Sequence, residues 1–148
     1  MLERIPYDRR AAVAYAHQWA YGRNPDFYDY EEIGSDCTNF ASQCLYAGTG
    51  VMNFDPVYGW FYRDPNDKAP AWTGVEYFFD FITRQTPSPG PFGISTTLSG
   101  LEPGDFVQFR FNKDVFGHTP VVVEIGRPAT LQNTLIAAHS YDADWRPL

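Results

Sequence analysis

Cys37 is the residue of this chain best placed for nucleophilic chemistry. It follows Gly34-Ser35-Asp36, which are good residues to begin a helix, and it opens a stretch with helical character that runs to about Ala47. The partial positive charge at a helix N-terminus favours a thiolate, and the thiolate is the form of cysteine that attacks an amide. Cys44, two turns further along, is expected to be a buried structural residue. Cys37 is therefore our candidate nucleophile.

A thiol nucleophile also needs a base, and the C-terminal half of the chain supplies two candidate histidines. His118 follows Gly117 at the start of an apolar run, where an imidazole can project into a cleft. His139 lies near the end of the next apolar run. His17 lies on the flank of an N-terminal helical stretch, and we expect it to be a surface residue.

The spacing of the last two apolar runs predicts how these two histidines lie. Residues 118–125 and 133–140 have the pattern of strands, and residues 126–131 form a turn-rich connection between them. In the hairpin with that connection, His118 falls directly opposite His139, and opposed side chains lie about 5 Å apart on one face. We therefore expect an imidazole–imidazole hydrogen bond through which His139 orients His118. A one-residue slip in register would break this pairing.

The elements that must position these residues predict an α+β fold. Helices are expected over residues 9–21, capped by Tyr7-Asp8, over 37–47, closed by Gly48, and over 72–84, and strands over 106–111, 118–125 and 133–140. Helices that precede antiparallel strands are typical of α+β proteins. The length, 148 residues, is that of one domain covering residues 1–148.

Polar and aromatic residues near Cys37 are candidates for substrate binding. Asp36 and Asn39 flank the cysteine, and residues 49–71 form a long Gly-, Pro-, Asn- and Asp-rich loop that we expect to be functional or lid-like. Trp60 and Trp72 lie in or beside this loop, so we expect them to flank a substrate cleft. An alternative is a non-catalytic module in which Trp60, Phe61, Tyr62 and Trp72 bind a cell-wall glycan.

Composition excludes several classes of function. The net charge is −7, with no basic run, which argues against nucleic-acid binding. No apolar stretch approaches the roughly 20 residues that span a bilayer. The first residues, 1–6, lack the apolar region of a signal peptide. The protein is expected to be globular, and a monomer is favoured.

A metal or a disulfide is not expected. Cys37 and Cys44 lie seven residues apart on one expected helix, about 10 Å along its axis, which is too far for a disulfide. Their spacing fits no usual zinc pattern. The acidic stretch 26–36 matches no EF-hand loop, although calcium binding remains a lesser alternative to a solvated acidic loop.

Five segments resemble the bacterial putative amidase domain family. They are residues 36–45 (DCTNFASQCL), 7–16 (YDRRAAVAYA), 104–109 (GDFVQF), 117–123 (GHTPVVV) and 138–140 (AHS). The match extends over nearly the whole chain, and the segment around the cysteine is highly specific. The family is similar to the CHAP and NlpC-like domains of the papain-like superfamily.

The resemblance implies a papain-like fold and a Cys37–His118–His139 triad that hydrolyses amide bonds through a thioester, without a cofactor. It implies peptidoglycan or a peptide as the substrate, and an extracellular or cell-envelope location. A transglutaminase or acyltransferase with the same triad remains open, because an amine can replace water in the second step.

Overall fold

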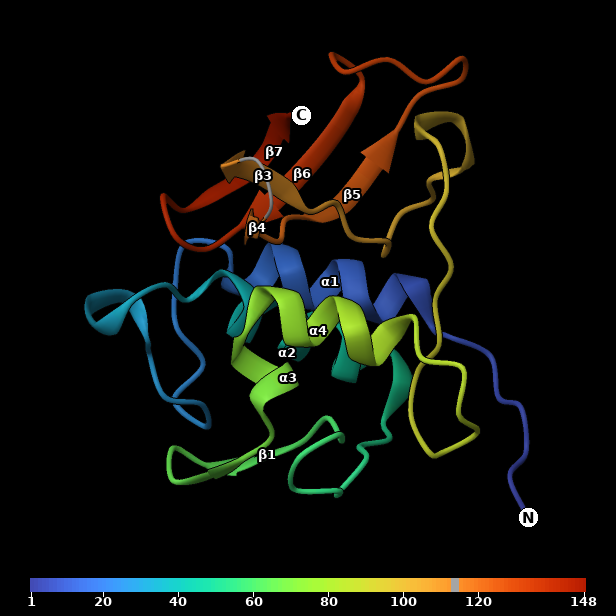
Figure 1. The fold of residues 1–148 in the computed structure, drawn as a ribbon. Helices are drawn as coiled ribbons and strands as arrows, with labels where there is room; N and C mark the ends of the chain where they lie inside the picture. The colour runs from blue at the N-terminus through green and yellow to red at the C-terminus, as the bar shows by residue number, and fades with distance from the viewer. Residues whose placement is uncertain (113–114) are drawn as a thin grey trace.

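The computed structural model describes residues 1–112 and 115–148, and within them the helices precede the main antiparallel sheet (Figure 1). The helices are α1 (Arg9–Trp19), α2 (Cys37–Thr49), α3 (Pro70–Thr73) and α4 (Val75–Ile82), with 3-10 turns at Glu31–Ile33 and Leu98–Gly100. The strands are β1 (Tyr62–Asp64), β2 (Asp67–Lys68), β3 (Phe109–Asn112), β4 (Val115–His118), β5 (Val121–Ile125), β6 (Thr134–Ala138) and β7 (Ala143–Pro147). This order confirms the α+β class.

Helices α1 and α2 pack together and against one face of the β5–β6–β7 sheet (Figure 1). Asp8 caps α1 as expected, because its Oδ1 accepts a hydrogen bond of 3.0 Å from the Ala11 N–H. Ala12 and Ala16, at helical spacing on one face, and Ala20, directly after the helix, are fully buried. Their small side chains let the two helices approach closely.

The C-terminus of α2 differs from the expected end at Gly48. The helix continues to Thr49 and ends at Gly50, whose φ of 65° is the left-handed conformation that glycine adopts readily. Gly48 lies inside the helix, and Tyr7 and Asp8 pack onto it, so that no larger residue fits there. An added Cβ there would clash with the Tyr7 ring and lie 2.7 Å from the Asp8 carbonyl oxygen. Both glycines are needed, but only the second ends the helix.

The expected helix 72–84 is two helices instead of one. Gly74, between α3 and α4, has extended backbone angles (φ −102°, ψ 126°), which interrupts the helix. The spacing places Val75, Phe78, Phe79 and Ile82 on one apolar face. Phe78 is buried and the other three are half-buried, while Phe81, which lies outside that set, is buried as well. Pro70 begins α3, a position where its missing N–H costs nothing.

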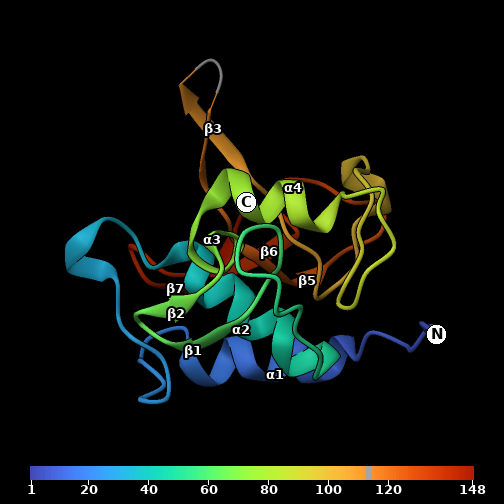
Figure 2. The ribbon, with the colours of Figure 1, turned by 60° about the horizontal axis from the view of Figure 1, so that its bottom comes forward.

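The strand expected at 118–125 is also divided. β4 ends at His118 and β5 begins at Val121, because the intervening Thr119-Pro120 breaks the ladder and proline has no N–H to donate. β4 pairs with β3 in a hairpin that projects from the body of the molecule, as Figure 2 shows. The two histidines of the predicted pair therefore do not share one hairpin.

The central sheet has the antiparallel order β5–β6–β7. β6 confirms the strand expected at 133–140, although it spans only Thr134–Ala138. β7 was not expected, and it contributes the second neighbour of β6. The run 106–111 enters a strand only at Phe109, while Phe106 forms an isolated bridge with Val121.

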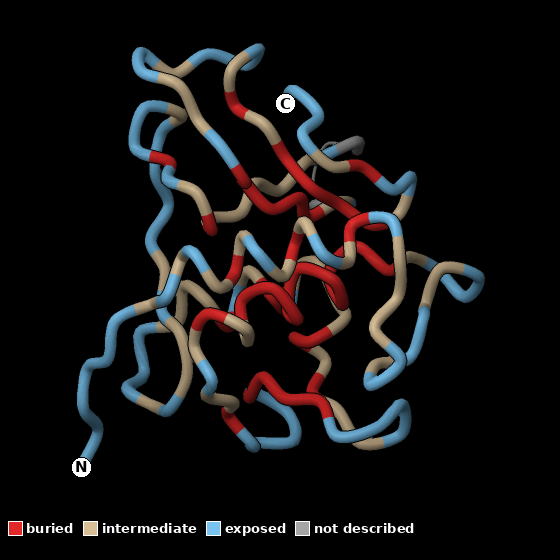
Figure 3. The backbone as a smooth tube through the Cα atoms, turned by 180° about the vertical axis from the view of Figure 1, so that it is seen from behind, coloured by how far each residue is buried: buried red, intermediate tan, exposed pale blue. Residues whose placement is uncertain are grey.

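Buried residues gather along α2, in the sheet and in the segment before β1 (Figure 3). Cys44 is fully buried in the core that α1, α2 and the sheet share, as expected for a structural cysteine. Both cysteines are free. In the part of the chain that the structure describes, no helix has the length and apolar character needed to cross a bilayer.

Candidate functional site

Cys37 is the first residue of α2, as the sequence predicts. Its N–H donates to Ser35 Oγ over 3.3 Å, and its Sγ lies 3.7 Å from Thr38 Oγ1. The residue is only 1% exposed, so the thiol is covered in this conformation. The residue therefore lies at the N-terminus of α2, as a nucleophile at a helix start requires.

His118 is the last residue of β4 and lines a cavity of about 260 Å³. The cavity is formed by Gly34, Ser35, Gly117, His118, Ser140 and Tyr141. Burial lowers the pKa of His118 below its ordinary value of 6.5, and the positive charge of Arg146 lowers it further. The imidazole is therefore held in its neutral form, which can accept a proton.

Two hydrogen bonds bring the surroundings of Cys37 and His118 together. Thr38 Oγ1 lies 3.1 Å from Thr119 Oγ1, so the residues that directly follow the cysteine and the histidine are in contact. Ser35, whose hydroxyl accepts from the Cys37 N–H, lines the cavity beside His118. Among the described contacts, none joins Cys37 Sγ directly to the His118 ring. The structure thus brings the neighbours of the two candidates into contact, while Cys37 itself is covered and is not among the residues that line the cavity.

His139 does not bond to His118, and this corrects the register expected from the sequence. β5 pairs with β6 so that Val121 lies opposite Ala137, and His139 lies beyond the end of β6. The His139 Nδ1 lies 2.5 Å from Asp36 Oδ2. Its Nε2 lies 2.9 Å from the carbonyl oxygen of Trp19. The hairpin prediction failed for two reasons. It would have paired Val121 with Ile136, one residue away from the observed register, and it treated residues 118–125 as one continuous strand.

Asp36 and Asn39, expected to contact the substrate, are buried and bonded within the protein. Asn39 Nδ2 donates to the Tyr28 carbonyl and to Asp36 Oδ1, at 2.8 and 2.9 Å. Burial raises the pKa of Asp36, but hydrogen bonds from His139, Asn39 and the Tyr30 N–H outweigh it, so the net pKa lies below 3.8. Both residues hold the loop before α2 against the helix.

Trp60 and Trp72, expected to flank a cleft, are fully buried in the core. Their ring centroids are 4.8 Å apart. The Trp60 indole N–H donates to Ser42 Oγ at 2.9 Å, and the Trp72 indole N–H donates to Asn39 Oδ1 at 3.0 Å. With both polar atoms satisfied inside the protein, these rings stabilise the fold instead of facing a substrate. The glycan-binding alternative therefore loses the residues on which it rested.

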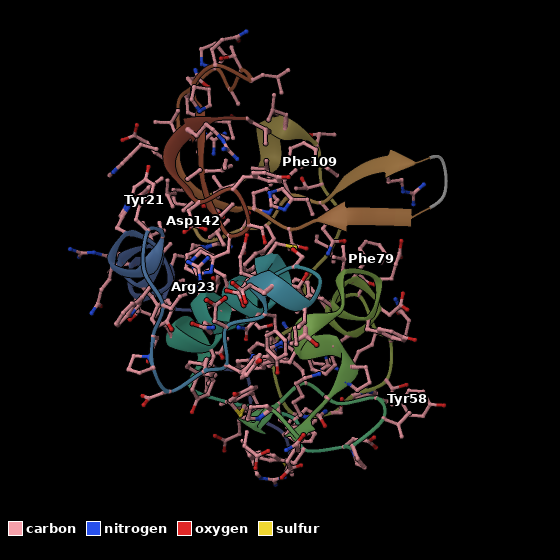
Figure 4. The ribbon with its side chains drawn as sticks, turned by 90° about the vertical axis from the view of Figure 1, so that its left-hand side faces the viewer. Tyr21, Arg23, Tyr58, Phe79, Phe109 and Asp142 are labelled. Atoms are coloured by element: carbon pink, nitrogen blue, oxygen red, sulfur yellow. The ribbon has the colours of Figure 1, made fainter. Side chains whose placement is uncertain are left out.

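Arg23 is a site residue that the sequence reasoning missed. Its guanidinium makes a bidentate pair with Asp142, at 3.0 and 3.1 Å, and its Nη1 lies 3.0 Å from His139 Nε2. Figure 4 shows Arg23 beside the C-terminal segment that carries Asp142. Asp29 and Asp36 lie within 3.2 and 3.7 Å of the Arg23 Nε. The available signal in the sequence was the position of Arg23, a single cation shortly before the acidic stretch 26–36.

Ser140 is a second residue that the sequence reasoning missed. Its hydroxyl donates to Glu31 Oε2 at 2.6 Å and lies 3.1 Å from the Asp36 N–H. It thereby joins the end of the sheet to the start of α2. Among the described residues, no group of three or more His, Cys, Asp or Glu side chains is arranged to hold a metal ion.

Comparisons with known proteins agree with the motif pattern. A family model described as putative amidase domain matches residues 6–148. An uncharacterized protein of Bacillus subtilis (strain 168), YhbB, is 30% identical over 143 residues. That alignment covers 95% of this chain but 43% of the relative, so the chain spans less than half of the relative's length. No solved structure is a significant match.

Proposed function

Because this chain belongs to the putative amidase domain family, we propose that it hydrolyses amide bonds with Cys37 as the nucleophile and His118 as the base. The observation that carries the proposal is the contact between Thr38 and Thr119 at 3.1 Å. It holds the helix start that presents the cysteine against the strand end that presents the histidine. An exposed or distant histidine would not support this chemistry.

The reaction follows from the properties of these two residues. His118 first takes the proton of the Cys37 thiol and becomes an imidazolium. The thiolate then attacks the carbonyl carbon, and a tetrahedral intermediate forms with negative charge on the oxygen. Backbone N–H groups at the start of α2 stabilise that charge. Imidazolium at His118 then protonates the amine as it leaves, and a thioester remains. Water activated by neutral His118 hydrolyses the thioester and restores the thiol. Every step uses the chain's own residues.

In this proposal, His139 positions the nucleophile through its contacts with residues on either side of Cys37 in the sequence. Its ring binds Asp36 and stacks on Phe40 with centroids 4.0 Å apart, so it holds the first turn of α2 in place. This role replaces the one that the sequence assigned to it. His139 is therefore a positioning residue that acts through the backbone around Cys37.

The covered thiol requires a movement before the substrate can react. At 1% exposure, Cys37 is reached only if the residues that cover it move aside. Catalytic hydrogen bonds are commonly longer in a free enzyme than in its substrate complex. Substrate binding would then shorten the distance between Cys37 and His118.

Peptidoglycan amides are the substrate that we propose. The support is the resemblance of the motif around Cys37 to domains that act on the cell wall. The same resemblance supports an extracellular or cell-envelope location and a papain-like fold. An N-acetylmuramoyl-L-alanine bond and a stem-peptide bond both contain the required amide.

Digestion of purified peptidoglycan tests the proposal directly. Mass spectrometry of the released fragments should show cleavage by the wild type and by Cys44→Ala, with a loss of at least about 10³-fold for Cys37→Ala. Wild-type activity in Cys37→Ala would refute the nucleophile. An added primary amine that becomes joined to the acyl fragment would instead indicate a transferase.

A further inference from the structure

Two buried threonines connect Cys37 with the segment that follows His118. Thr38 Oγ1 lies 3.7 Å from Cys37 Sγ and 3.1 Å from Thr119 Oγ1. Thr119 Oγ1 in turn lies 3.2 Å from Gln108 Nε2. We propose that Gln108, Thr119 and Thr38 form a directed hydrogen-bond relay that ends in a donor to the Cys37 sulfur and favours its thiolate.

The direction of the relay is set by Gln108. Its Nε2 lies 3.0 Å from the carbonyl oxygen of Val75, and a carbonyl oxygen can only accept a hydrogen bond. The atom facing Val75 is therefore the amide nitrogen, since the opposite orientation would place two acceptors in contact. One hydrogen of the NH₂ group goes to Val75, and the other goes to Thr119 Oγ1.

The remaining hydrogens then have one arrangement that uses all of them. With Thr119 Oγ1 accepting from Gln108, its own hydrogen is free to donate to Thr38 Oγ1. The Thr38 hydrogen is in turn free to donate to the Cys37 sulfur. A thiolate can only accept, so it completes this chain. A thiol that donated to Thr38 would turn the Thr38 hydrogen toward Thr119 Oγ1, and the Thr119 hydrogen would then have no acceptor among the described contacts.

Burial makes this order matter energetically. Thr38 and Thr119 are both 0% exposed, and Cys37 is 1% exposed. A buried hydroxyl is costly unless it is hydrogen-bonded, and valine would fill the same space without that cost. Hydrogen bonds in such surroundings strengthen one another and are stronger when the acceptor is charged. A hydrogen-bonding role toward the Cys37 sulfur therefore explains two buried threonines here better than a packing role, which valine could fill.

The relay deepens the proposed function, since it assigns positioning residues to the proposed nucleophile. It can nevertheless be tested without any substrate. Formation of the thiolate is followed by its ultraviolet absorbance as the pH is raised. Every protein carries Cys44→Ala, and the spectrum of the matching Cys37→Ser protein is subtracted to remove the tyrosine signal.

Thr38→Val should raise the midpoint of the Cys37 titration by at least about half a pH unit, which is a roughly threefold lower thiolate fraction below the midpoint. Thr38→Ser keeps the hydroxyl and should restore the wild-type midpoint. Thr119→Val should shift the midpoint in the same direction by less, because it acts through Thr38. This graded order would not follow from a role in packing alone.

Thr134→Val is the matched control. Its hydroxyl is also fully buried and donates to the Thr130 carbonyl at 2.7 Å, but it takes no part in the relay. It should leave the midpoint unchanged. Unchanged midpoints in both Thr38→Val and Thr119→Val would overturn the relay, and Thr119→Val alone decides if Thr38→Val does not fold. Peptidoglycan cleavage that depends on Cys37 would stand in either case.

Discussion

His139 Nδ1 lies 2.5 Å from Asp36 Oδ2, so the last histidine of the chain is joined to the residue before the proposed nucleophile. Arg23 lies against the other side of the same imidazole, with Nη1 3.0 Å from Nε2. Segments from both ends of the chain therefore meet at the start of α2. Because Cys37 is the next residue, its position depends on contacts that span more than 100 residues of sequence.

The first prediction concerns the bond between His139 and Asp36. Both side chains are buried, and loss of the imidazole leaves the buried Asp36 carboxylate without one of its hydrogen bonds, which is strongly destabilising. His139→Ala should lower the free energy of unfolding by about 3 kcal/mol and also lower kcat. In a double-mutant cycle with Asp36→Ala, the two losses should fall short of additivity by about 1–3 kcal/mol. Urea unfolding of the wild type, the two single variants and the double variant gives the four free energies of unfolding that the cycle compares.

His17→Ala is the control for this cycle. His17 also bonds a carboxylate, Asp144, at 2.8 Å, but its side chain is 26% exposed and it makes no described hydrogen bond to the segment around Cys37. It should cost about 1 kcal/mol or less and leave kcat unchanged. If His139→Ala were as mild as His17→Ala, the anchoring role of His139 would have to be abandoned.

The second prediction concerns Trp72. Trp72→Phe keeps an aromatic ring but removes the donor to Asn39 Oδ1, which would be left buried without that bond. The free energy of unfolding should fall by about 1–3 kcal/mol. KM should stay unchanged, because the ring faces the core. Tyr58→Ala, at an 81% exposed aromatic, should change stability by less than about 0.5 kcal/mol. A raised KM with unchanged stability in Trp72→Phe would restore the cleft assignment.

Features set by local chemistry could be predicted from the sequence. The Asp8 cap and the start of α2 at Cys37 depend on a few neighbouring residues, and both are confirmed. Spacing also predicted the burial of Phe78 in α4, but not that of Phe81. Cys37 could be selected as the candidate nucleophile for the same reason, since a helix start has a local signature.

Features set by distant partners could not be predicted in the same way. The partner of His139 depended on a strand register, and Pro120 was a local signal of the break that the prediction did not use. The bonds of Arg23 to Asp142, and of Trp72 to Asn39, join segments whose approach no spacing rule describes. Trp60 and Trp72, in or beside a Gly- and Pro-rich loop, favoured the prediction of a cleft, but in the folded chain both rings are buried in the core.

The third prediction concerns the two glycines at the end of α2. Gly48→Ala places a methyl group against the Tyr7 ring and 2.7 Å from the Asp8 carbonyl oxygen, so backbone must shift. It should cost about 3 kcal/mol. Gly50→Ala meets open space but must keep φ at 65°, which should cost about 1 kcal/mol. Thermal or urea unfolding gives both values. The reverse order would mean that Tyr7 does not pack on this helix.

The last prediction separates two titrations by their pH windows. The pKa of His118 is lowered in the folded state, so below pH 6.5 the unfolded chain binds more protons than the folded one. Stability should therefore fall as pH drops from 7 through 6.5, until the lower folded pKa is reached. The pKa of Asp36 is lowered from 3.8, so its contribution is present above 3.8 and is lost only as pH falls through its folded pKa.

Urea unfolding of three proteins between pH 7 and pH 3 distinguishes these windows. His118→Gln should remove part of the slope just below pH 6.5 and leave the slope below 3.8 intact. Asp36→Asn should remove the slope below pH 3.8 and leave the slope just below pH 6.5 intact. It should also lower the free energy of unfolding at pH 7, because a buried carboxylate then no longer faces His139. An unchanged slope below pH 6.5 in His118→Gln would mean that the imidazole is not held neutral by its burial, and its assignment as the base would lose that support.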